Sequence, residues 1–101
     1  MMKLTVLYGQ PTNTEAFEQH YGTVHLPAVA KVPGVARAEY TRFVAAADGG
    51  KPGFYRMAEL YFRDQAQMEQ SLGSPAGKAV VADASQLATG GLTIIVGTVD
   101  A

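Results

Sequence analysis

The chain has 101 residues, of which 48% are hydrophobic and 17% charged, and its formal net charge is −1 at pH 7. This length suits one domain with one core, and the composition is that of a folded rather than a disordered protein. A net charge near zero argues against nucleic acid as a partner, because a phosphate backbone is bound by a basic surface. With no cysteine, the chain has no disulfide, no cysteine-ligated metal and no thiolate nucleophile.

The sequence has no segment typical of targeting or membrane insertion. Its first residues lack the apolar run of a secretory signal, and no stretch approaches the roughly 20 apolar residues that a membrane span needs. We therefore expect one domain over residues 1–101, located in the cytoplasm and without a membrane partner.

The N-terminal third predicts a strand followed by a helix. Residues 3–9 are rich in β-formers and lead into a Gly-Gln-Pro turn. The Thr-Asn-Thr-Glu sequence at residues 12–15 is typical of a capping box, which marks a helix start. Apolar residues then recur at helical spacing until Pro33-Gly34 ends the helix. The predicted buried stripe consists of Phe17, Tyr21, Val24, Ala28 and Val32.

Three further segments predict strands. Residues 35–46 and 54–62 are joined by the glycine-rich residues 48–53, which predicts a hairpin. Residues 92–99 form the last predicted strand and are apolar at odd and even positions alike. We therefore expect both faces of this strand to be covered.

Two helical segments precede the last strand. Asp64 is placed to cap a short helix that ends near Gly73. Ser74 followed by Pro75 is a second start signal, because serine caps free amides and proline is favoured at the first helical position. This second helix reaches about Leu87, and its predicted inward residues are Ala76, Val80, Ala84 and Leu87.

The order βαββαβ predicts an α+β ferredoxin-like fold, in which helices cover one face of a four-stranded antiparallel sheet. Even-numbered residues of the second and third strands suit the helix-covered face. Odd-numbered ones, including Met57, Glu59 and Tyr61, mix apolar, aromatic and charged side chains as a protein interface does. We therefore predict a homodimer with the two sheets face to face. For Glu59 we expect an ion pair with Arg37 or Arg42 rather than a catalytic role.

The sequence contains two histidines, His20 and His25, both on the first predicted helix. Five residues apart, they diverge by about 140° around a helix, too far to share a metal ion, and we predict no metal site. Two neighbours favour His25 as a functional residue: Gly22 leaves space one turn earlier, and Pro27 removes the amide that would bond to the Thr23 carbonyl. The alternative is a core-edge histidine bonded to a carbonyl or to water. We expect His20 to lie on the solvent-exposed face of this helix.

Side chains near His25 predict a small-molecule pocket between the first helix and the even-numbered face of the sheet. Two tyrosines there could orient a ligand oxygen, and small residues would supply room. Each tyrosine also has an ordinary interpretation as an amphipathic residue at the edge of the core. The predicted ligand-binding residues beside His25 are Tyr21, Ala38, Tyr40, Leu60 and Phe62.

Several short segments, taken in order, carry a family resemblance. They are Leu7-Tyr8-Gly9-Gln10-Pro11, Phe17 with Tyr21, His25-Leu26-Pro27, Pro33-Gly34, Ala58-Glu59-Leu60-Tyr61-Phe62, Ser74-Pro75 and Ala88-Thr89-Gly90-Gly91. Their order and spacing over nearly the whole chain resemble the EthD family of dimeric α/β barrels, named after a protein associated with ethyl tert-butyl ether degradation. The resemblance implies that His25 faces a pocket between sheet and helices.

The resemblance leaves two function classes open. The family's usual "reductase" label, and the cofactor-free isomerases, cyclases, decarboxylases and monooxygenases of the same barrel superfamily, imply an enzyme. It would act without a cofactor on an aromatic or lactone-like metabolite, with His25 as general base or acid, or as an oxidoreductase by the family label. The alternative is a non-catalytic small-molecule binding or accessory protein of a degradation pathway. Additional histidine or cysteine catalysts of some relatives have no counterpart here, because the chain has no cysteine and no histidine outside the first helix.

Overall fold

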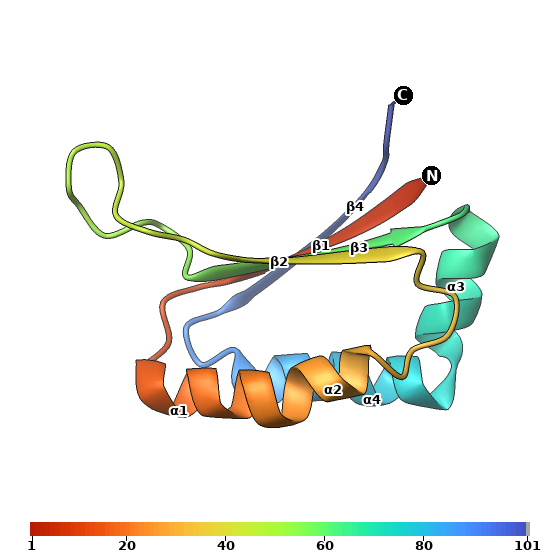
Figure 1. The fold of residues 1–101 in the computed structure, drawn as a ribbon, viewed down its shortest axis with the longest axis horizontal. Helices are drawn as coiled ribbons and strands as arrows, with labels where there is room; N and C mark the ends of the chain where they lie inside the picture. Colours follow the sequence, from red (N-terminus) through yellow and green to blue (C-terminus); the bar gives the residue numbers. More distant parts are fainter. Residues whose placement is uncertain (101) are drawn as a thin grey trace.

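The strands join into one antiparallel sheet (Figure 1). In the computed structural model, which describes residues 1–100, the strands are β1 (Met2–Tyr8), β2 (Arg37–Arg42), β3 (Arg56–Phe62) and β4 (Leu92–Thr98). Their order across the sheet is β2-β3-β1-β4, and each neighbouring pair is antiparallel. This topology confirms the predicted α+β ferredoxin-like fold.

The helices cover one face of this sheet, as Figure 1 shows. α1 (Thr14–His20), a π-helical turn η1 (Tyr21–His25) and α2 (Leu26–Val29) form one continuous stretch, hereafter the first helical stretch. α3 (Gln65–Gly73) leads from β3 to α4 (Pro75–Leu87), which lies beside the first helical stretch. Among residues 1–100, none of the helices is long and apolar enough to cross a membrane.

Side chains cap the helix starts. Asp64 and Ser74 each accept a hydrogen bond from the backbone amide three residues later, at 2.8 and 3.1 Å, as predicted. The predicted capping box is wrong by one residue, because Asn13 rather than Thr12 caps α1. The amide of Thr12 donates instead to the hydroxyl of Thr89 at 3.1 Å, which ties residue 12 to the loop before β4.

The hairpin arms are shorter than predicted. Pairing covers residues 37–42 and 56–61, whereas the sequence predicted strands over 35–46 and 54–62. Beyond the paired residues the loop closes on itself, with the Ala46 amide donating to the Gly50 carbonyl at 2.8 Å. The loop therefore extends away from the sheet (Figure 1).

The first helical stretch departs from a regular helix in η1. There the amide of Leu26 bonds to the carbonyl of Tyr21, five residues earlier, which widens the turn. The prediction that Val24 faces inward is wrong, since Val24 is 47% exposed. His25 takes the inward position and is only 4% exposed.

Pro27 gives a physical reason for the wide turn. Proline has no amide to donate, and its ring collides with the carbonyl four residues earlier in a regular α-helix. One extra residue in the turn makes room for that ring and rotates the following side chains toward the sheet. The buried side chains consequently recur every four residues, at Phe17, Tyr21, His25 and Val29.

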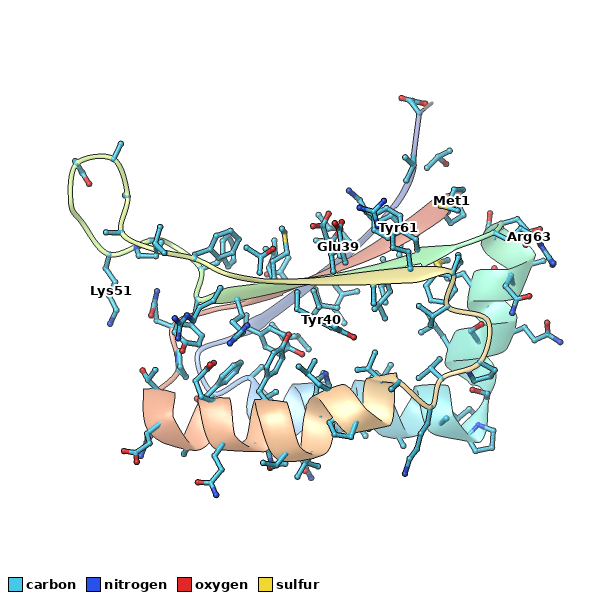
Figure 2. The ribbon with its side chains drawn as sticks, in the orientation of Figure 1. Met1, Glu39, Tyr40, Lys51, Tyr61 and Arg63 are labelled. Atoms are coloured by element: carbon cyan, nitrogen blue, oxygen red, sulfur yellow. The ribbon has the colours of Figure 1, made fainter. Side chains whose placement is uncertain are left out.

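The two faces of the sheet differ as their parity predicts. Even-numbered residues of β3, ending at the fully buried Phe62, face the helices. Figure 2 shows Tyr40 of β2 pointing to this side, and Glu39 and Tyr61 on the opposite face, which no described helix covers. We call this opposite face the bare face.

Charges on the bare face pair differently from the prediction. Glu59 binds Lys3 at 3.0 Å rather than Arg37 or Arg42. Arg37 instead binds Glu39 on its own strand at 2.7 Å. The reason is register: Glu39 and Glu59 lie directly opposite each other in the β2–β3 ladder, so each carboxylate needs its own cation.

β4 is partly open on both faces within one chain. Ile94, Ile95 and Val96 are 44%, 54% and 50% exposed. The predicted cover on both faces is therefore not supplied by the chain itself, because β4 is an edge strand that pairs only with β1.

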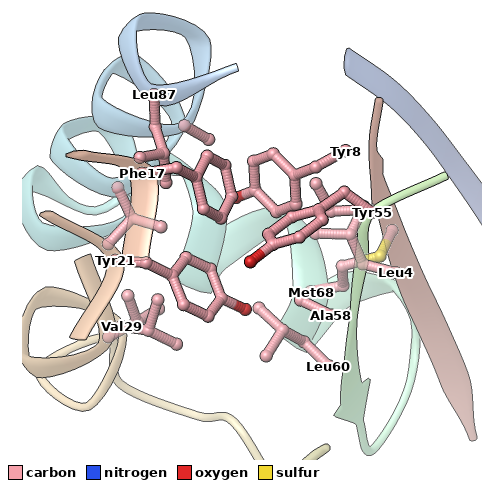
Figure 3. Packing of buried hydrophobic residues seen from close by; sticks show 14 of the residues in the cluster. Leu4, Tyr8, Phe17, Tyr21, Val29, Tyr55, Ala58, Leu60, Met68 and Leu87 are labelled. Carbon is pink, nitrogen blue, oxygen red and sulfur yellow. The ribbon is translucent and has the colours of Figure 1, made fainter. Parts of the chain in front are cut away.

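Aromatic rings fill the core between the sheet and the first helical stretch (Figure 3). Phe17 meets Tyr8 and Tyr55 edge to face, with ring centroids 5.4 and 5.3 Å apart, and stacks on Tyr21 at 5.4 Å. Such pairs contribute about 0.5–1.5 kcal/mol each beyond simple burial. This packing fixes the helical stretch that carries His25 against β1.

Candidate functional site

A small inner cavity lies between the sheet and the helices, beside His25. Its volume is about 40 Å³, close to the share of one water molecule in the liquid. Three of its lining residues are partly exposed, Tyr40 on β2 by 38%, Val81 on α4 by 42% and Ile94 on β4 by 44%. The lining residues are Leu4, Val6, Tyr8, His25, Val29, Val32, Tyr40, Ala58, Leu60, Leu72, Gly77, Val80, Val81, Ala84 and Ile94.

His25 is buried and has a partner on each ring nitrogen. Nδ1 lies 2.7 Å from Oδ2 of Asp83 on α4, and Nε2 lies 3.3 Å from the hydroxyl of Tyr8 on β1. The imidazole also stacks on the ring of Tyr21, with centroids 5.6 Å apart and planes 17° from parallel. Residues from three elements therefore fix the position and orientation of this ring.

Asp83 joins the two histidines. Its second oxygen, Oδ1, lies 2.7 Å from Nε2 of His20. Burial alone would raise the pKa of Asp83, but the hydrogen bonds and charges of His20 and His25 outweigh it and hold this pKa below its ordinary value. Asp83 is therefore an ionised hydrogen-bond acceptor at neutral pH.

The ionised carboxylate determines which nitrogen of His25 carries a proton. A carboxylate only accepts, so the bond to Asp83 requires a proton on Nδ1. In the neutral ring Nε2 then holds a lone pair, which accepts from the Tyr8 hydroxyl. Burial raises the pKa of Tyr8 far above its usual range, so this hydroxyl stays protonated. The result is a lone pair on Nε2 of an imidazole that lines the inner cavity.

Tyr21 lies outside the cavity lining but stacks on His25. Its hydroxyl is buried and has no hydrogen-bond partner among residues 1–100. Burial raises its pKa to about 12, so the hydroxyl is a neutral donor. The Arg56 guanidinium lies 4.7 Å from the Tyr21 ring centroid and is held by Glu18 through hydrogen bonds of 2.9 and 2.6 Å. An unpaired buried hydroxyl costs roughly 1–3 kcal/mol, which makes it a candidate partner for a ligand oxygen.

The structure brings part of the predicted pocket together. His25, Tyr40 and Leu60 all line the inner cavity. Ala38 is exposed on the edge strand β2, and Phe62 is fully buried in the core without lining the cavity. The predicted residues thus share one side of the sheet, but they do not all surround one space.

The predicted role of Gly22 is wrong. Gly22 is exposed, and a methyl group there would meet no atom of the described residues within 4 Å. The open space beside it is therefore solvent rather than room for a ligand at the imidazole. The π turn is the reason, because it turns His25 inward and leaves Gly22 on the outer side.

Sequence reasoning missed Asp83 and Tyr8. Asp83 stands three residues after Val80 and four before Leu87, at the border of the buried stripe of α4. A carboxylate at that spacing was the available signal. Tyr8 alternates with Val6 on the buried side of β1, and nothing in the sequence pairs it with a particular histidine.

A second hollow, the outer groove, lies where α1 meets the end of α4. It has a volume of about 410 Å³ and opens to solvent. His20 lines it, and 38% of its side chain is exposed. The prediction that His20 lies on a solvent-exposed face is therefore only partly right, because Nε2 of the ring is bonded to Asp83. The other lining residues are Thr12, Asn13, Ala16, Phe17, Gln86, Leu87 and Thr89.

The cluster of two histidines and Asp83 does not have the geometry of a metal site. Within residues 1–100, no three His, Asp or Glu side chains converge closely enough to hold a metal ion. Each imidazole bonds a different oxygen of the carboxylate. The arrangement is a hydrogen-bonded chain that runs from the outer groove to the inner cavity.

Comparison with known proteins gives a consistent family assignment. Residues 9–91 match the model of the EthD domain. An uncharacterized 11.0 kDa protein from the thcB-thcC intergenic region of Rhodococcus erythropolis is 35% identical over 95 residues, which cover 94% of this chain and 91% of that protein.

Solved structures agree with this match. An ethyl tert-butyl ether degradation (EthD) family protein from Bacillus halodurans has a TM-score of 0.93 and 36% identity, and the match covers 99% of both chains. SnoaB, a cofactor-independent oxygenase from Streptomyces nogalater, shares the fold with a TM-score of 0.69 and 16% identity, over 97% of this chain and 91% of that one. This chain belongs to the EthD family.

Proposed function

We propose that this protein is a cofactor-independent acid–base enzyme for a small aromatic or lactone-like metabolite. His25 is the proposed catalytic residue, and its Nε2 is the atom that takes and returns a proton. One observation carries the proposal. The ring lines an apolar cavity and is bonded through Nδ1 to an ionised carboxylate.

The proposed step is a proton transfer that needs no redox partner. Nε2 takes a proton from an acidic C–H or O–H group, and the electron pair of that bond stays on the substrate as an enolate or phenolate. Asp83, 2.7 Å from Nδ1, stabilises the imidazolium that forms. Nε2 then returns the proton to another substrate atom, which completes an isomerisation or a ring closure. Alternatively, Nε2 takes the O–H proton of a carboxylic acid, the C–C bond breaks to release carbon dioxide, and Nε2 returns that proton to the carbanion that remains.

Two tyrosine hydroxyls supply the proposed oxygen contacts. The Tyr8–His25 bond of 3.3 Å is long for a hydrogen bond from a hydroxyl, so a ligand atom can replace it at little cost. Displaced from Nε2, the neutral Tyr8 hydroxyl can donate to the oxyanion that develops on the substrate. The unpaired hydroxyl of Tyr21 is a second proposed donor, which a ligand reaches only if the cavity widens, since Tyr21 does not line it.

Substrate binding requires the inner cavity to widen. At about 40 Å³ it has room for a water molecule but not for a metabolite. Val81 and Ile94 in its lining are aliphatic and partly exposed, so we propose that a change of their rotamers widens the cavity toward solvent. The apolar lining favours an aromatic or alicyclic substrate over a charged one.

The structural comparisons support chemistry without a cofactor on this fold. SnoaB is described as a cofactor-independent oxygenase. At 16% identity this similarity shows a shared fold, but it does not show a shared substrate or reaction. The proposal for this chain therefore depends on its own Asp83–His25–Tyr8 arrangement.

Hydrogen exchange into a bound compound tests the proposal. Small aromatic acids, phenols and lactones are first screened for binding by ligand-observed NMR. A compound that binds is then followed in D₂O, where proton abstraction and return replace a carbon-bound acidic hydrogen by deuterium, a replacement that is slow without a catalyst. Because loss of a positioned general base costs roughly 10²–10⁴-fold, His25→Gln is expected to slow this exchange by that factor while the compound still binds.

Two outcomes contradict an enzymatic role for His25. Wild-type rates of exchange in His25→Gln would place the proton transfer elsewhere. Tight binding without exchange in the wild-type protein would instead identify the alternative function, a binding or accessory protein. Thr23→Val, an exposed change in the same turn, is the matched control and is expected to leave exchange unchanged.

We further propose that the protein acts as a homodimer through the bare face. Ile95 is 54% exposed there, and Tyr61 and Glu39 add an aromatic ring and a charge that are bonded to each other at 3.1 Å. A second copy of the sheet would cover Ile95 with apolar surface of the same kind. Light scattering is expected to give about twice the 10.7 kDa chain mass, and the mass of one chain would contradict the proposal.

A further inference from the structure

The two histidines compete for one carboxylate from opposite sides. Asp83 binds His25 through Oδ2 and His20 through Oδ1, each at 2.7 Å. The His25 side chain is 5% exposed and the His20 side chain 38% exposed. One member of the pair therefore lies at the inner cavity and the other in the outer groove.

We propose that His20 is a positioning residue that sets the basicity of His25 through their shared carboxylate. This inference rests on the proposed role of His25 as the base. A neutral His20 leaves the full negative charge of Asp83 to stabilise a proton on His25. A protonated His20 neutralises that charge and repels a second positive charge nearby, so the two imidazoles bind protons anticooperatively.

His20 also constrains the geometry of the carboxylate. With Oδ1 bonded to His20, rotation of Asp83 would break two short hydrogen bonds at once. Oδ2 therefore stays directed at Nδ1 of His25, which keeps the lone pair of the neutral ring on Nε2. Removal of His20 frees this carboxylate on the groove side.

Other ionisable groups around His25 are placed to change little near neutral pH. Tyr8 from β1, Tyr21 from η1 and Tyr40 from β2 all have a pKa raised by burial, so they stay neutral. On β3, Arg56 is paired with Glu18 of α1, whose pKa that guanidinium lowers. Apart from His25 itself, the ionisable group in contact with Asp83 is therefore His20.

The outer groove gives His20 an environment of its own. Its volume of about 410 Å³ is open, so solvent protons and small anions reach His20 without entering the inner cavity. A negatively charged group in the groove would favour protonated His20 and weaken His25 as a base. The buried site would then respond to a signal bound outside it.

Histidine-detected NMR on the free protein tests this coupling without a substrate. Ring resonances of ¹⁵N-histidine-labelled protein are followed from pH 4 to 9 in the wild type and in His20→Gln. Glutamine keeps a neutral amide donor for Asp83 but does not titrate. We expect His25 resonances to follow two steps in the wild type, because they sense both protons. In His20→Gln we expect one step, displaced upward by about half a pH unit or more.

Two controls separate this effect from a structural change. Gln86→Ala alters the wall of the same groove without removing a titratable group, and its titration curves should match the wild type. Asp83→Asn removes the shared carboxylate, and adding His20→Gln to it should then shift His25 much less than in the wild-type background.

Superimposable His25 titration curves in the wild type and His20→Gln would overturn the inference. That result would leave the proposed catalytic role of His25 intact, because that role is tested by hydrogen exchange in His25→Gln. Conversely, a coupled titration with no exchange would retain the inference as a property of a binding site. If His20→Gln folds poorly, the same titration in His20→Asn provides the test.

Discussion

α4 and the first helical stretch lie side by side beneath the same sheet, yet they bury their residues by different rules (Figure 1). In α4 the buried residues Val80, Ala84 and Leu87 follow the intervals of four and three that a regular helix requires. In the first helical stretch the interval from Phe17 to Val29 is always four, and only the π turn keeps those side chains in line.

The regular helix α4 mainly packs the core, whereas the irregular turn η1 positions a residue of the candidate site. The regular spacing of α4 builds the core, and its one charged residue near the site, Asp83, sits at the border of the stripe. The irregular turn exchanges Val24 for His25 as the inward residue. A local departure from helical geometry thus places a titratable group at the cavity wall, as π turns at functional sites often do.

The largest expected effect contrasts one residue from each region. Leu87→Ala in α4 removes a side chain that is 7% exposed, and truncation of a buried leucine costs about 2–5 kcal/mol. Val24→Ala in η1 removes one that is 47% exposed, and such surface changes stay within about 0.5 kcal/mol. Urea unfolding of both variants at pH 7 measures the difference in the free energy of unfolding.

The same pair of variants distinguishes the two helix geometries. A regular helix would bury Val24, so a loss of 2 kcal/mol or more in Val24→Ala would show that η1 is α-helical in solution. An equal loss in both variants would remove the distinction between the regions.

A smaller effect is expected at the contact between them. Asp83→Asn replaces an ionised acceptor of two short hydrogen bonds, and hydrogen bonds to charged groups contribute about 1.5–3 kcal/mol. The pKa of Asp83 is lowered in the folded state, so its contribution is present above the unfolded pKa of about 3.9. That contribution is lost as the pH falls through the lower, folded value.

Thermal or urea unfolding from pH 7 to pH 2 checks the sign. The wild type should be more stable than Asp83→Asn at pH 7, and the difference should shrink below about pH 4. Asp100→Asn, which changes an exposed aspartate, is the control and should show no such dependence. A difference that stays constant down to pH 2 would contradict the role of Asp83 as an ionised acceptor.

Particular residues show how far the sequence predicts this molecule. Parity placed Tyr40 and Leu60 on the helix side of the sheet, because a strand has a fixed period of two. The prediction from helical spacing was wrong at Val24, because the extra residue in the π turn changes the direction of every later side chain. Pro27 is the only local sign of that extra residue in the sequence. Asp83 was missed because its bond to His25 joins residues 58 positions apart, and such pairs follow from tertiary packing rather than spacing.

The smallest expected effect concerns Gly22, on the outer side of η1. A glycine inside a helix loses about 0.5–1 kcal/mol relative to alanine, because its unfolded backbone has more freedom. Its backbone φ is not positive, and a methyl group there meets no described atom within 4 Å. Gly22→Ala should therefore raise the free energy of unfolding by about 0.4–1 kcal/mol, measured by urea unfolding.

Two glycine controls bracket this prediction. Gly73→Ala, at the end of α3, also has open space around it and should be neutral or mildly stabilising. Gly90→Ala should destabilise, because its methyl group would overlap the carbonyl oxygen of Gln10. If Gly22→Ala destabilised the protein as Gly90→Ala does, the π turn would need the backbone freedom of glycine itself. The inward position of His25 would then depend on Gly22 as well as on Pro27.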